Sequence, residues 1–283
     1  MKYSNSILVV GSGDWAKKIN SSLNKSEYFN AIDQVAAREL LNMYSLPNLG
    51  SKTSLITWIA TTPEFQIEIL EKFSDQTGKF ILEKPIGIQK EDFTRLNGIL
   101  RKVVNPPTLS NPWSNTTIWR EAKEIILKEN SAFTGSIRRS GPTRRKYISP
   151  FEDWSPHDIY LLLELDLDLR PSNPIFKKLD LLEIQIQIGQ RGKVSFTSGY
   201  SKDRTALWNL RFDSGKELSL NFITNSLAVN YEPYNSTDTN ISSNQQEPIL
   251  AVAINAINGG GMEVQRHIHV LERIHTLTHN RTA

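Results

Sequence analysis

The chain has no cysteine among its 283 residues. Its absence excludes a disulfide framework, a zinc–thiolate site and a cysteine nucleophile, and it fits a reducing compartment. Long apolar runs are absent too, so no segment is long enough to span a membrane. The first short run, residues 7–10, ends at a polar glycine loop, unlike the apolar part of a signal peptide. We therefore expect a cytoplasmic protein without a membrane partner.

An excess of charge of either sign is also missing. Lys and Arg number 33 against 30 Asp and Glu, which leaves a formal charge of +3. A nucleic-acid-binding chain usually carries a larger basic excess and an aromatic–basic motif, so we expect no nucleic-acid partner. With 39% hydrophobic and 22% charged residues, the composition is that of a globular protein, and the length favours two domains.

Apolar strands alternate with helical patterns over the first hundred residues. The expected strands are residues 7–10, 32–36, 55–60 and 79–82, and the expected helices are residues 15–23, 38–44, 64–73 and 91–104. Such alternation with short connections predicts a parallel sheet with right-handed crossovers. We therefore expect an α/β domain with a parallel sheet over residues 1–107.

The pattern changes after Asn105, Pro106 and Pro107. One more helix is expected at residues 118–129, followed by strands with period-two alternation, most clearly at 183–188 and 217–222, and by helical pieces at 250–257 and 263–277. Alternation of this kind predicts an antiparallel sheet with one packed face. The expected fold is α/β, with residues 108–283 forming an α+β domain around a large, mostly antiparallel open sheet. Its open face predicts a homodimer or homotetramer, and the terminal helix could pack back on the first domain.

A glycine turn follows the first strand and opens the first helix. It consists of Gly11, Ser12, Gly13, Asp14, Trp15 and Ala16. In such a turn the first glycine permits the sharp bend, the second lets the backbone approach a pyrophosphate, and the small third residue keeps helix and strand close. The helix N-terminus then offers N–H groups to the phosphates. The pattern predicts a dinucleotide site, with an ordinary strand–turn–helix as the alternative.

The choice of dinucleotide depends on the end of the second strand. NAD binders place an acid there for the ribose hydroxyl, whereas NADP binders need a cation for the 2′-phosphate. Here the strand ends without an acid and Arg38 follows, whose fork suits a phosphate. This favours NADP over NAD. Asp33 is the competing candidate, and a solvated cation is the alternative for Arg38.

Three segments carry groups that could move a proton beside a nicotinamide. Glu83, Lys84 and Pro85 directly follow the fourth strand, where ligands of parallel sheets bind. Pro85 could form a cis bond that aims Lys84. Asp153 and His157 would share one face if a helical turn connects them, with Pro156 in its first turn. A histidine suits the removal of an alcohol proton as hydride leaves the same carbon. Helix capping by Asp153 and a core role for His157 are the alternatives.

These segments together resemble the glucose–fructose oxidoreductase / inositol 2-dehydrogenase / rhizopine-catabolism (Gfo/Idh/MocA) family. The shared pattern is the glycine turn, the Ala60, Thr61, Thr62, Pro63 segment after the third strand, Glu83-Lys84-Pro85, and the Asp153–His157 pair. The resemblance covers nearly the whole chain. It implies an NAD(P)-binding Rossmann domain over residues 1–107 and a substrate-binding domain over residues 108–283. It also implies that the glycine turn, Thr61, Thr62, Pro63, Glu83 and Lys84 contact the bound NAD or NADP, and that Lys84, Asp153 and His157 lie in the catalytic cleft. Family members act on sugars, cyclitols, nucleotide sugars and some non-sugar substrates. The stretch 24–54 is compressed, and residues 147–152 replace the family's glycine-rich lead-in.

Other side chains are candidates for contact with the substrate. Asn111, Trp113 and Trp119 could line a sugar subsite or pack in the core. Arg138, Arg139, Arg144, Arg145 and Lys146 could receive an anionic group, or form a solvated edge or a dimer contact. His275 and His279 have helical spacing but no associated carboxylate motif, so a polar helix face is expected there and no metal site.

The leading hypothesis is an NADP-preferring dehydrogenase or reductase. It would transfer a hydride between nicotinamide and the alcohol or ketone of a small sugar-like substrate, such as a sugar, sugar phosphate, nucleotide sugar or cyclitol. One alternative is a reductase of a non-sugar imine or conjugated compound on the same scaffold. Another is a dinucleotide-binding regulator without turnover, although such a protein has no need for Lys84, Asp153 and His157.

Overall fold

The computed structural model describes residues 5–47, 55–76, 78–142, 148–165, 168–177, 181–234, 246–261 and 264–279. The contacts between Cα atoms divide the chain into two compact units. The first unit contains residues 1–112 and 245–268, and the second contains residues 113–244 and 269–283. The first unit is therefore formed by two separate stretches of the chain, because a segment near the C-terminus packs with the N-terminal sheet.

The first unit is built on a five-stranded parallel sheet with the order β2-β1-β3-β4-β5. Its strands are β1 (Ser6–Val10), β2 (Ala31–Val35), β3 (Leu55–Ile59), β4 (Lys79–Leu82) and β5 (Thr108–Leu109). The first four match the expected strands, whereas β5 lies just beyond residue 107 and its two residues give no periodic signal. The order is that of a doubly wound sheet, which places a ligand crevice where the connections diverge, between the carboxyl ends of β1 and β3.

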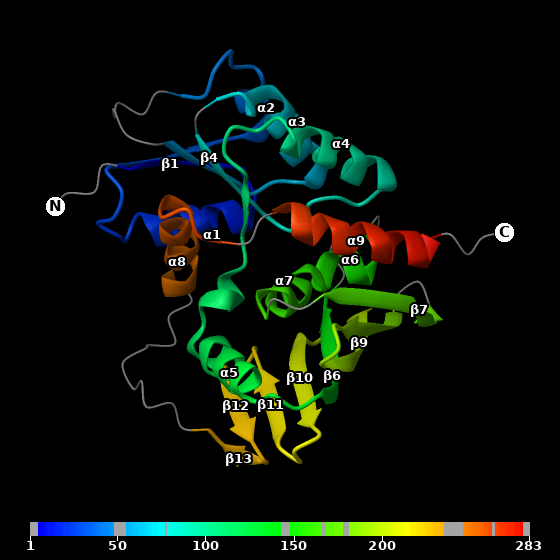
Figure 1. Cartoon of the computed structure of the whole chain (residues 1–283). Coiled ribbons are helices and arrows are strands. Elements are labelled where there is room, and N and C mark those ends of the chain that lie inside the picture. The colour runs from blue at the N-terminus through cyan, green and yellow to red at the C-terminus, as the bar shows by residue number, and fades with distance from the viewer. Residues whose placement is uncertain are drawn as a thin grey trace. The chain divides into compact units, whose positions relative to one another are not determined.

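Helices cover both faces of this sheet, as Figure 1 shows. They are α1 (Asp14–Leu23), α2 (Ala37–Leu41), α3 (Pro63–Phe73), α4 (Lys90–Leu100) and α8 (Gln246–Ile257). One face packs against α1 and α8 in a single apolar cluster that includes Val9, Ile19, Trp58 and Val252. The helices α2, α3 and α4 lie on the other face. Strands buried on both faces explain the unbroken apolar run of β1.

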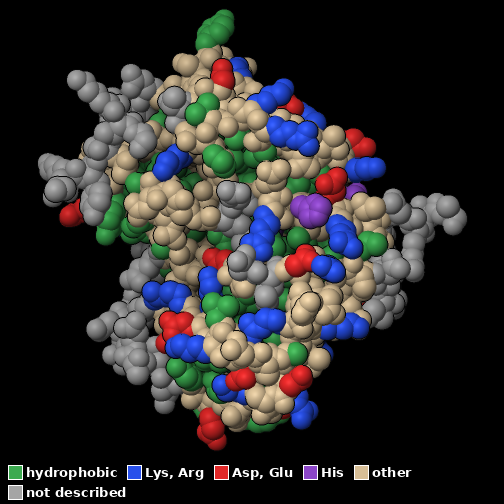
Figure 2. Space-filling view, viewed as in Figure 1, with side chains coloured by type: hydrophobic (Ala, Val, Ile, Leu, Met, Phe, Trp, Pro, Cys, Tyr) green, Lys and Arg blue, Asp and Glu red, His purple; other side chains and the backbone are tan. Residues whose placement is uncertain are grey.

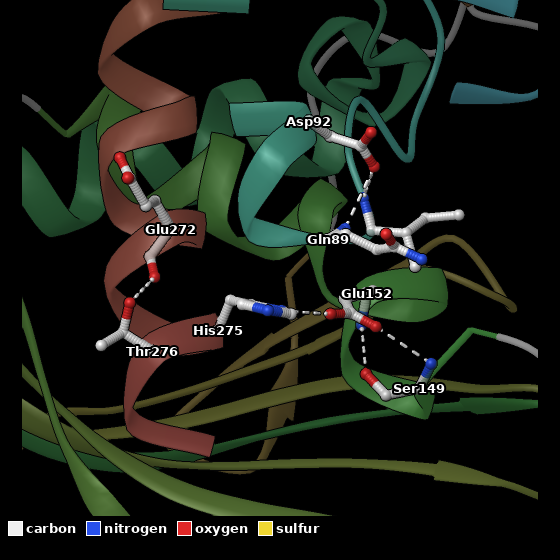
Figure 3. Close-up of polar contacts among 8 residues, drawn as sticks. Gln89, Asp92, Ser149, Glu152, Glu272, His275 and Thr276 are labelled. Carbon is white, nitrogen blue, oxygen red and sulfur yellow. Dashed lines mark hydrogen bonds and ion pairs between the residues drawn. The ribbon is translucent and has the colours of Figure 1, made fainter. Parts of the chain in front are cut away.

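Polar side chains fix the ends of two helices of the first unit. Lys79 donates from Nζ to the carbonyl oxygens of Ala256 (3.0 Å) and Ile257 (2.6 Å), which satisfies the C-terminus of α8. At the start of α4, the backbone N–H of Gln89 donates to Oδ2 of Asp92 (3.0 Å), one half of a capping box (Figure 3). Lys79 of β4 therefore ties the end of α8 to the sheet, and the capping box fixes where α4 begins.

The second unit contains an eight-stranded sheet with the order β13-β12-β11-β10-β6-β9-β8-β7. Its strands are β6 (Phe133–Gly141), β7 (Leu169–Lys177), β8 (Leu181–Ile188), β9 (Gly192–Tyr200), β10 (Thr205–Phe212), β11 (Glu217–Asn221), β12 (Ser226–Val229) and β13 (Glu232–Pro233). The β6–β9 pair is parallel and the other pairs are antiparallel. The prediction of a parallel sheet followed by a large, mostly antiparallel sheet is confirmed.

One face of this sheet is apolar and packed, and the other is polar. In β8 the side chains of Leu182, Ile184, Ile186 and Ile188 are buried, while those between them are half-buried or exposed. The packed face contacts α5 (Thr117–Lys128) and α6 (Pro150–Trp154). On the opposite face, a cavity of about 490 Å³ is lined by polar residues that include Ser136, Asn209, Arg211, Glu217 and Ser219. The alternation predicted at 183–188 and 217–222 is thus confirmed.

Three further helical segments complete the described chain. They are the 3₁₀ helix at Pro112–Asn115, α7 (Pro156–Glu164) and α9 (Val264–His279). None of the helices in the described part is long and apolar enough to cross a lipid bilayer. On the face shown in Figure 2, Lys and Arg side chains are interspersed with Asp and Glu instead of forming one basic stripe.

Candidate functional site

Four candidate segments lie side by side at the carboxyl edge of the parallel sheet. Backbone hydrogen bonds continue the sheet past its strands, from Gly11 N–H to Val35 (2.8 Å), Ala60 N–H to Val10 (2.8 Å), Glu83 N–H to Ile59 (3.2 Å) and Ser110 N–H to Leu82 (2.8 Å). The glycine turn, the Ala60–Thr62 segment, the Glu83–Pro85 segment and the residues before Trp113 therefore occupy neighbouring positions. Segments separated by up to a hundred residues in sequence share the edge where α/β proteins bind ligands.

Gly11 is required by a close approach of two chain segments. Its φ is +145°, and a Cβ atom added there would lie 2.3 Å from the carbonyl oxygen of Ala60. Gln34 holds the same turn, because its Nε2 donates to the carbonyl oxygen of Gly11 (2.8 Å) and its Oε1 accepts from Nδ2 of Asn20 (2.9 Å). The bend after β1 is therefore fixed from β2, β3 and α1.

The second glycine of the turn faces open space instead. A Cβ added at Gly13 would meet no atom within 4 Å, and Gly13 precedes α1 without a side-chain hydrogen bond that caps the helix. Ala16 is buried against the sheet. The uncapped N–H groups and the space beside Gly13 fit a pyrophosphate, since such groups bind anions. Asp14 adds a carboxylate to the first turn, which would have to point away from the phosphates.

The region after β2 contains a cation and no acid at the strand's end. Arg38 is exposed in the first turn of α2, and its guanidinium carbon lies 5.9 Å from the centroid of the Phe65 ring at the start of α3. Asp33 lies inside β2, and its Oδ1 accepts from the backbone N–H of Gln34 (2.8 Å). Of the two competing residues, Arg38 is the one that lies past the strand's end.

The backbone around Lys84 is held by a buried glutamine that no sequence motif indicates. Gln66 of α3 is 1% exposed, and its Nε2 donates to the carbonyl oxygens of Glu83 (2.9 Å), Pro85 (3.2 Å) and Thr61 (3.3 Å). Its Oε1 accepts from the N–H of Glu83 (3.0 Å). The amide thus fixes the backbone on both sides of half-buried Lys84, and it links this segment to the turn before α3. The Lys84–Pro85 bond is cis, as the sequence suggested.

The side chain of Glu83 belongs to the interior of the first unit. It is 4% exposed, and its Oε1 accepts from Nε1 of Trp58 (2.9 Å). Burial raises the pKa of this carboxyl group above its usual value, although hydrogen-bond donors such as Trp58 and the charge of Lys84 oppose the shift. We therefore interpret the Glu83 side chain as a support for the segment, although the resemblance predicted a cofactor contact for this residue.

The Asp153–His157 pair lies in the second unit on two consecutive helices. Asp153 is buried near the end of α6, and half-buried His157 is the second residue of α7. Ser155, which separates the helices, keeps helical backbone angles and accepts from the N–H of Ile159 (3.1 Å). Pro156 occupies the first helical position as predicted, because its missing N–H has no partner to lose there.

The helix that carries Asp153 is capped at its N-terminus and is linked to α9 through the glutamate of the cap. Ser149 Oγ accepts from the N–H of Glu152 (3.3 Å), and Oε2 of Glu152 accepts from the N–H of Ser149 (3.0 Å), a complete capping box. The other oxygen of Glu152 contacts Nδ1 of His275 in α9 at 2.9 Å (Figure 3). His275, on the helix face that the sequence predicted to be polar, is thus a hydrogen-bond partner of the residue next to Asp153. The side chain of His279 lies outside the described residues.

The aromatic candidates separate into a core residue and a residue beside His157. Trp119 is fully buried and donates from Nε1 to Oε2 of Glu164 (2.6 Å), so it packs in the core. Trp113 is half-buried, and its ring centroid lies 6.5 Å from that of His157 at an interplanar angle of 78°. Trp113 therefore remains a candidate for substrate contact. Asn111, in the first unit, is buried.

The arginine-rich segment has different environments along its length. Arg139 is 4% exposed and forms a bidentate ion pair with Asp158, so its charge is neutralised inside the second unit. It is not a free receptor for an anionic substrate. Arg138 is exposed on β6. The candidates Arg144 and Arg145, together with Lys146, lie outside the described residues.

Comparison with solved structures shows that the chain shares its fold with several proteins named as oxidoreductases. No protein-family model matches the sequence, and no curated protein matches it. An oxidoreductase from Sinorhizobium meliloti superposes with a TM-score of 0.74 at 11% identity, covering 100% of this chain and 99% of that one. UDP-N-acetylglucosamine 3-dehydrogenase from Acidithiobacillus ferrooxidans gives 0.68 at 13% identity, covering 97% and 98%. The chain has the fold of these enzymes.

A third structure with this fold is a reductase of a different substrate class. Biliverdin reductase from Synechocystis, solved with biliverdin and NADP⁺, gives a TM-score of 0.63 at 12% identity, covering 97% of this chain and 98% of that one. The fold therefore occurs in proteins named for a nucleotide sugar and for a conjugated tetrapyrrole. Because one fold hosts many functions, the function must be argued from the site.

Proposed function

We propose that the protein is an NAD(P)-dependent oxidoreductase of the Gfo/Idh/MocA type, acting on the alcohol or ketone of a small sugar-like substrate. The observation that carries the proposal is the carboxyl edge of the parallel sheet. There an uncapped helix N-terminus beside open space at Gly13 lies at the same sheet edge as the Lys84 segment, with the Ala60–Thr62 segment between them. The likeness in fold to dehydrogenases over nearly the whole chain supports it.

The residues of the glycine turn, from Gly11 to Ala16, would hold the pyrophosphate, and Thr61, Thr62 and Pro63 would border the nicotinamide half. The bound nicotinamide would supply or accept the hydride. Arg38 would contact the 2′-phosphate, because it follows β2 where no acid stands. This last assignment makes NADP the preferred cofactor.

The proton that accompanies hydride transfer would be handled by His157. A general acid–base group near the reacting oxygen lowers the barrier in both directions, and imidazole titrates near neutral pH. Lys84 would orient the substrate and relay the proton, and Asp153 would orient the substrate or the imidazole. The proposal therefore requires both Lys84 and His157 to reach one substrate molecule.

The test is turnover of reduced nicotinamide with nucleotide sugars, sugar phosphates and cyclitols, followed by single variants. His157→Asn and Lys84→Ala should each lower kcat by roughly a hundredfold and leave the Kd for NADPH nearly unchanged. Lys102→Ala, an exposed lysine of the same unit, and His269→Gln, an exposed histidine, are the controls. If both active-site variants keep the wild-type rate, the assignment of these residues is wrong. Tight NADPH binding without turnover of any substrate would favour a regulator.

A second candidate is a reductase of a conjugated, non-sugar substrate. It is favoured by the fold likeness to a biliverdin reductase and by the Trp113 ring, since a planar conjugated molecule can stack on an aromatic face. Including biliverdin in the substrate panel separates the two candidates, because an enzyme of the second class would oxidise NADPH with the tetrapyrrole and with no sugar.

A further inference from the structure

A second carboxylate stands beside His157 and has no role in the proposed reaction. Asp158 directly follows His157 in the first turn of α7, and it is fully buried. Its two oxygens accept three hydrogen bonds. Arg139 donates from Nε to Oδ2 (2.7 Å) and from Nη2 to Oδ1 (2.6 Å), and Trp208 donates from Nε1 to Oδ1 (2.7 Å). The first turn of α7 is thereby attached to β6 and β10, two central strands of the sheet.

The same arginine also contacts the aromatic side chain that borders His157. The guanidinium carbon of Arg139 lies 5.5 Å from the centroid of the Trp113 ring and 5.6 Å from that of Phe222. Trp113 in turn meets His157 edge to face and Phe222 at a centroid distance of 5.5 Å. Arg139 therefore reaches His157 by two paths, through the backbone of Asp158 and through the ring of Trp113.

Stability alone is a weak explanation for this arrangement. Removing two charges from water costs several kcal/mol each, and a buried ion pair often gives no more stability than apolar side chains of similar volume. A bidentate, fully hydrogen-bonded pair nevertheless permits a single geometry, because the planar fork of arginine matches the carboxylate in one orientation. Such a pair is suited to fixing the angle of a helix whose second residue must point at a substrate.

We propose that Arg139, Asp158 and Trp208 form a positioning network that fixes the orientation of His157 and of Trp113. The proposal rests on the proposed function, in which His157 moves the proton. None of the three residues is assigned a contact with substrate or cofactor. Acid–base catalysis depends steeply on distance and angle, so a small displacement of the imidazole would lower turnover without weakening cofactor binding.

The decisive variant removes both charges at once. Arg139→Met combined with Asp158→Asn leaves no unpaired buried charge, and the amide oxygen of the asparagine can still accept from Trp208, so the unit should fold. Arg139→Lys is the conservative variant, because it keeps the positive charge but lacks the planar guanidinium group that makes two hydrogen bonds to Asp158. Arg170→Met is the matched control, because Arg170 forms an exposed pair with Asp168 (2.6 Å) in the same unit.

Each variant is characterised by its thermal midpoint, its Kd for NADPH, kcat and KM, and the NMR resonances of the imidazole protons. In the double variant, kcat per folded molecule should fall about tenfold or more at unchanged NADPH affinity. The ring current of Trp113 displaces the chemical shifts of the His157 imidazole protons in the wild type. In the double variant these chemical shifts should move toward those of an exposed histidine. Arg139→Lys should give intermediate values for both, and Arg170→Met should match the wild type.

Two results would overturn the positioning role. One is a folded double variant with wild-type kcat and a wild-type His157 resonance. The other is a loss of kcat that disappears when it is expressed per folded molecule, since that would be a structural effect. If the wild type itself turns over no substrate, the proposed function fails, and the NMR comparison still decides whether the network orients His157.

Discussion

Lowering the pH from 7 to 5 should destabilise the protein through one histidine. His267 is fully buried in α9, and neither ring nitrogen has a hydrogen-bond partner among the described residues. Burial disfavours the charged imidazolium and lowers the pKa of His267 from its usual 6.5 to about 3. The replacement His267→Leu removes the titrating ring and keeps an apolar side chain of similar volume at the site.

The sign and size of the effect follow from proton linkage. Below pH 6.5 the unfolded chain binds a proton at this position and the folded chain does not, so stability falls as the pH falls. Each pH unit well below 6.5 costs about 1.4 kcal/mol, and between pH 7 and 5 the loss amounts to about 2 kcal/mol. Glu83 and Glu164 act in the opposite direction, because burial raises the pKa of both carboxyl groups. The difference between wild type and variant isolates the histidine.

The assay is urea unfolding of wild type and His267→Leu at pH 7 and pH 5. The wild type should lose about 2 kcal/mol more than the variant, and the variant should be at least as stable at pH 7 because no hydrogen bond is removed. His269→Gln, an exposed position of the same helix, should keep the wild-type pH dependence because His267 is still present. Equal losses in wild type and His267→Leu, or an NMR titration of His267 near pH 6.5 in the folded protein, would refute the reasoning.

Four further outcomes are expected. Gln66→Met should destabilise the first unit by about 2–4 kcal/mol in urea unfolding and lower kcat, because carbonyl groups around Lys84 lose their donor; unchanged stability would contradict the assigned hydrogen bonds. Gly11→Ala should abolish NADPH binding measured by fluorescence titration, because its Cβ would lie 2.3 Å from the carbonyl oxygen of Ala60. Arg38→Ala should weaken NADPH and leave NADH affinity nearly unchanged, whereas tighter binding of NADH by the wild type would favour Asp33. The open polar face of the second sheet should mediate self-association, and a monomer at micromolar concentration in sedimentation would count against it.

The sequence by itself determined the local elements of the fold. The apolar run of β1, the glycines after it and the helix that follows are recognisable because turn chemistry and apolar periodicity act over a few residues. The period-two pattern of β8 likewise indicated which side chains are buried. The glycine turn, the Ala60–Thr62 segment and the Glu83–Pro85 segment each directly follow an expected parallel strand. Their common place at the carboxyl edge of the sheet therefore also follows from the sequence, since parallel strands end on the same side.

Only the tertiary structure decided which polar side chains support those segments. Gln66 gives no signal in sequence, because its partners at Glu83 and Pro85 lie 17 and 19 residues away. The same holds for Asp158, whose donors Arg139 and Trp208 lie 19 and 50 residues away. The sequence showed Arg139 only as one of several cations, whereas the structure shows it buried in an ion pair with Asp158. The sequence pattern predicted a cofactor contact for Glu83, whereas the structure shows its carboxyl group buried against Trp58. The hydrogen-bond partners and the desolvation of a polar side chain depend on packing between segments that are distant in sequence. They can therefore be identified only from the folded structure.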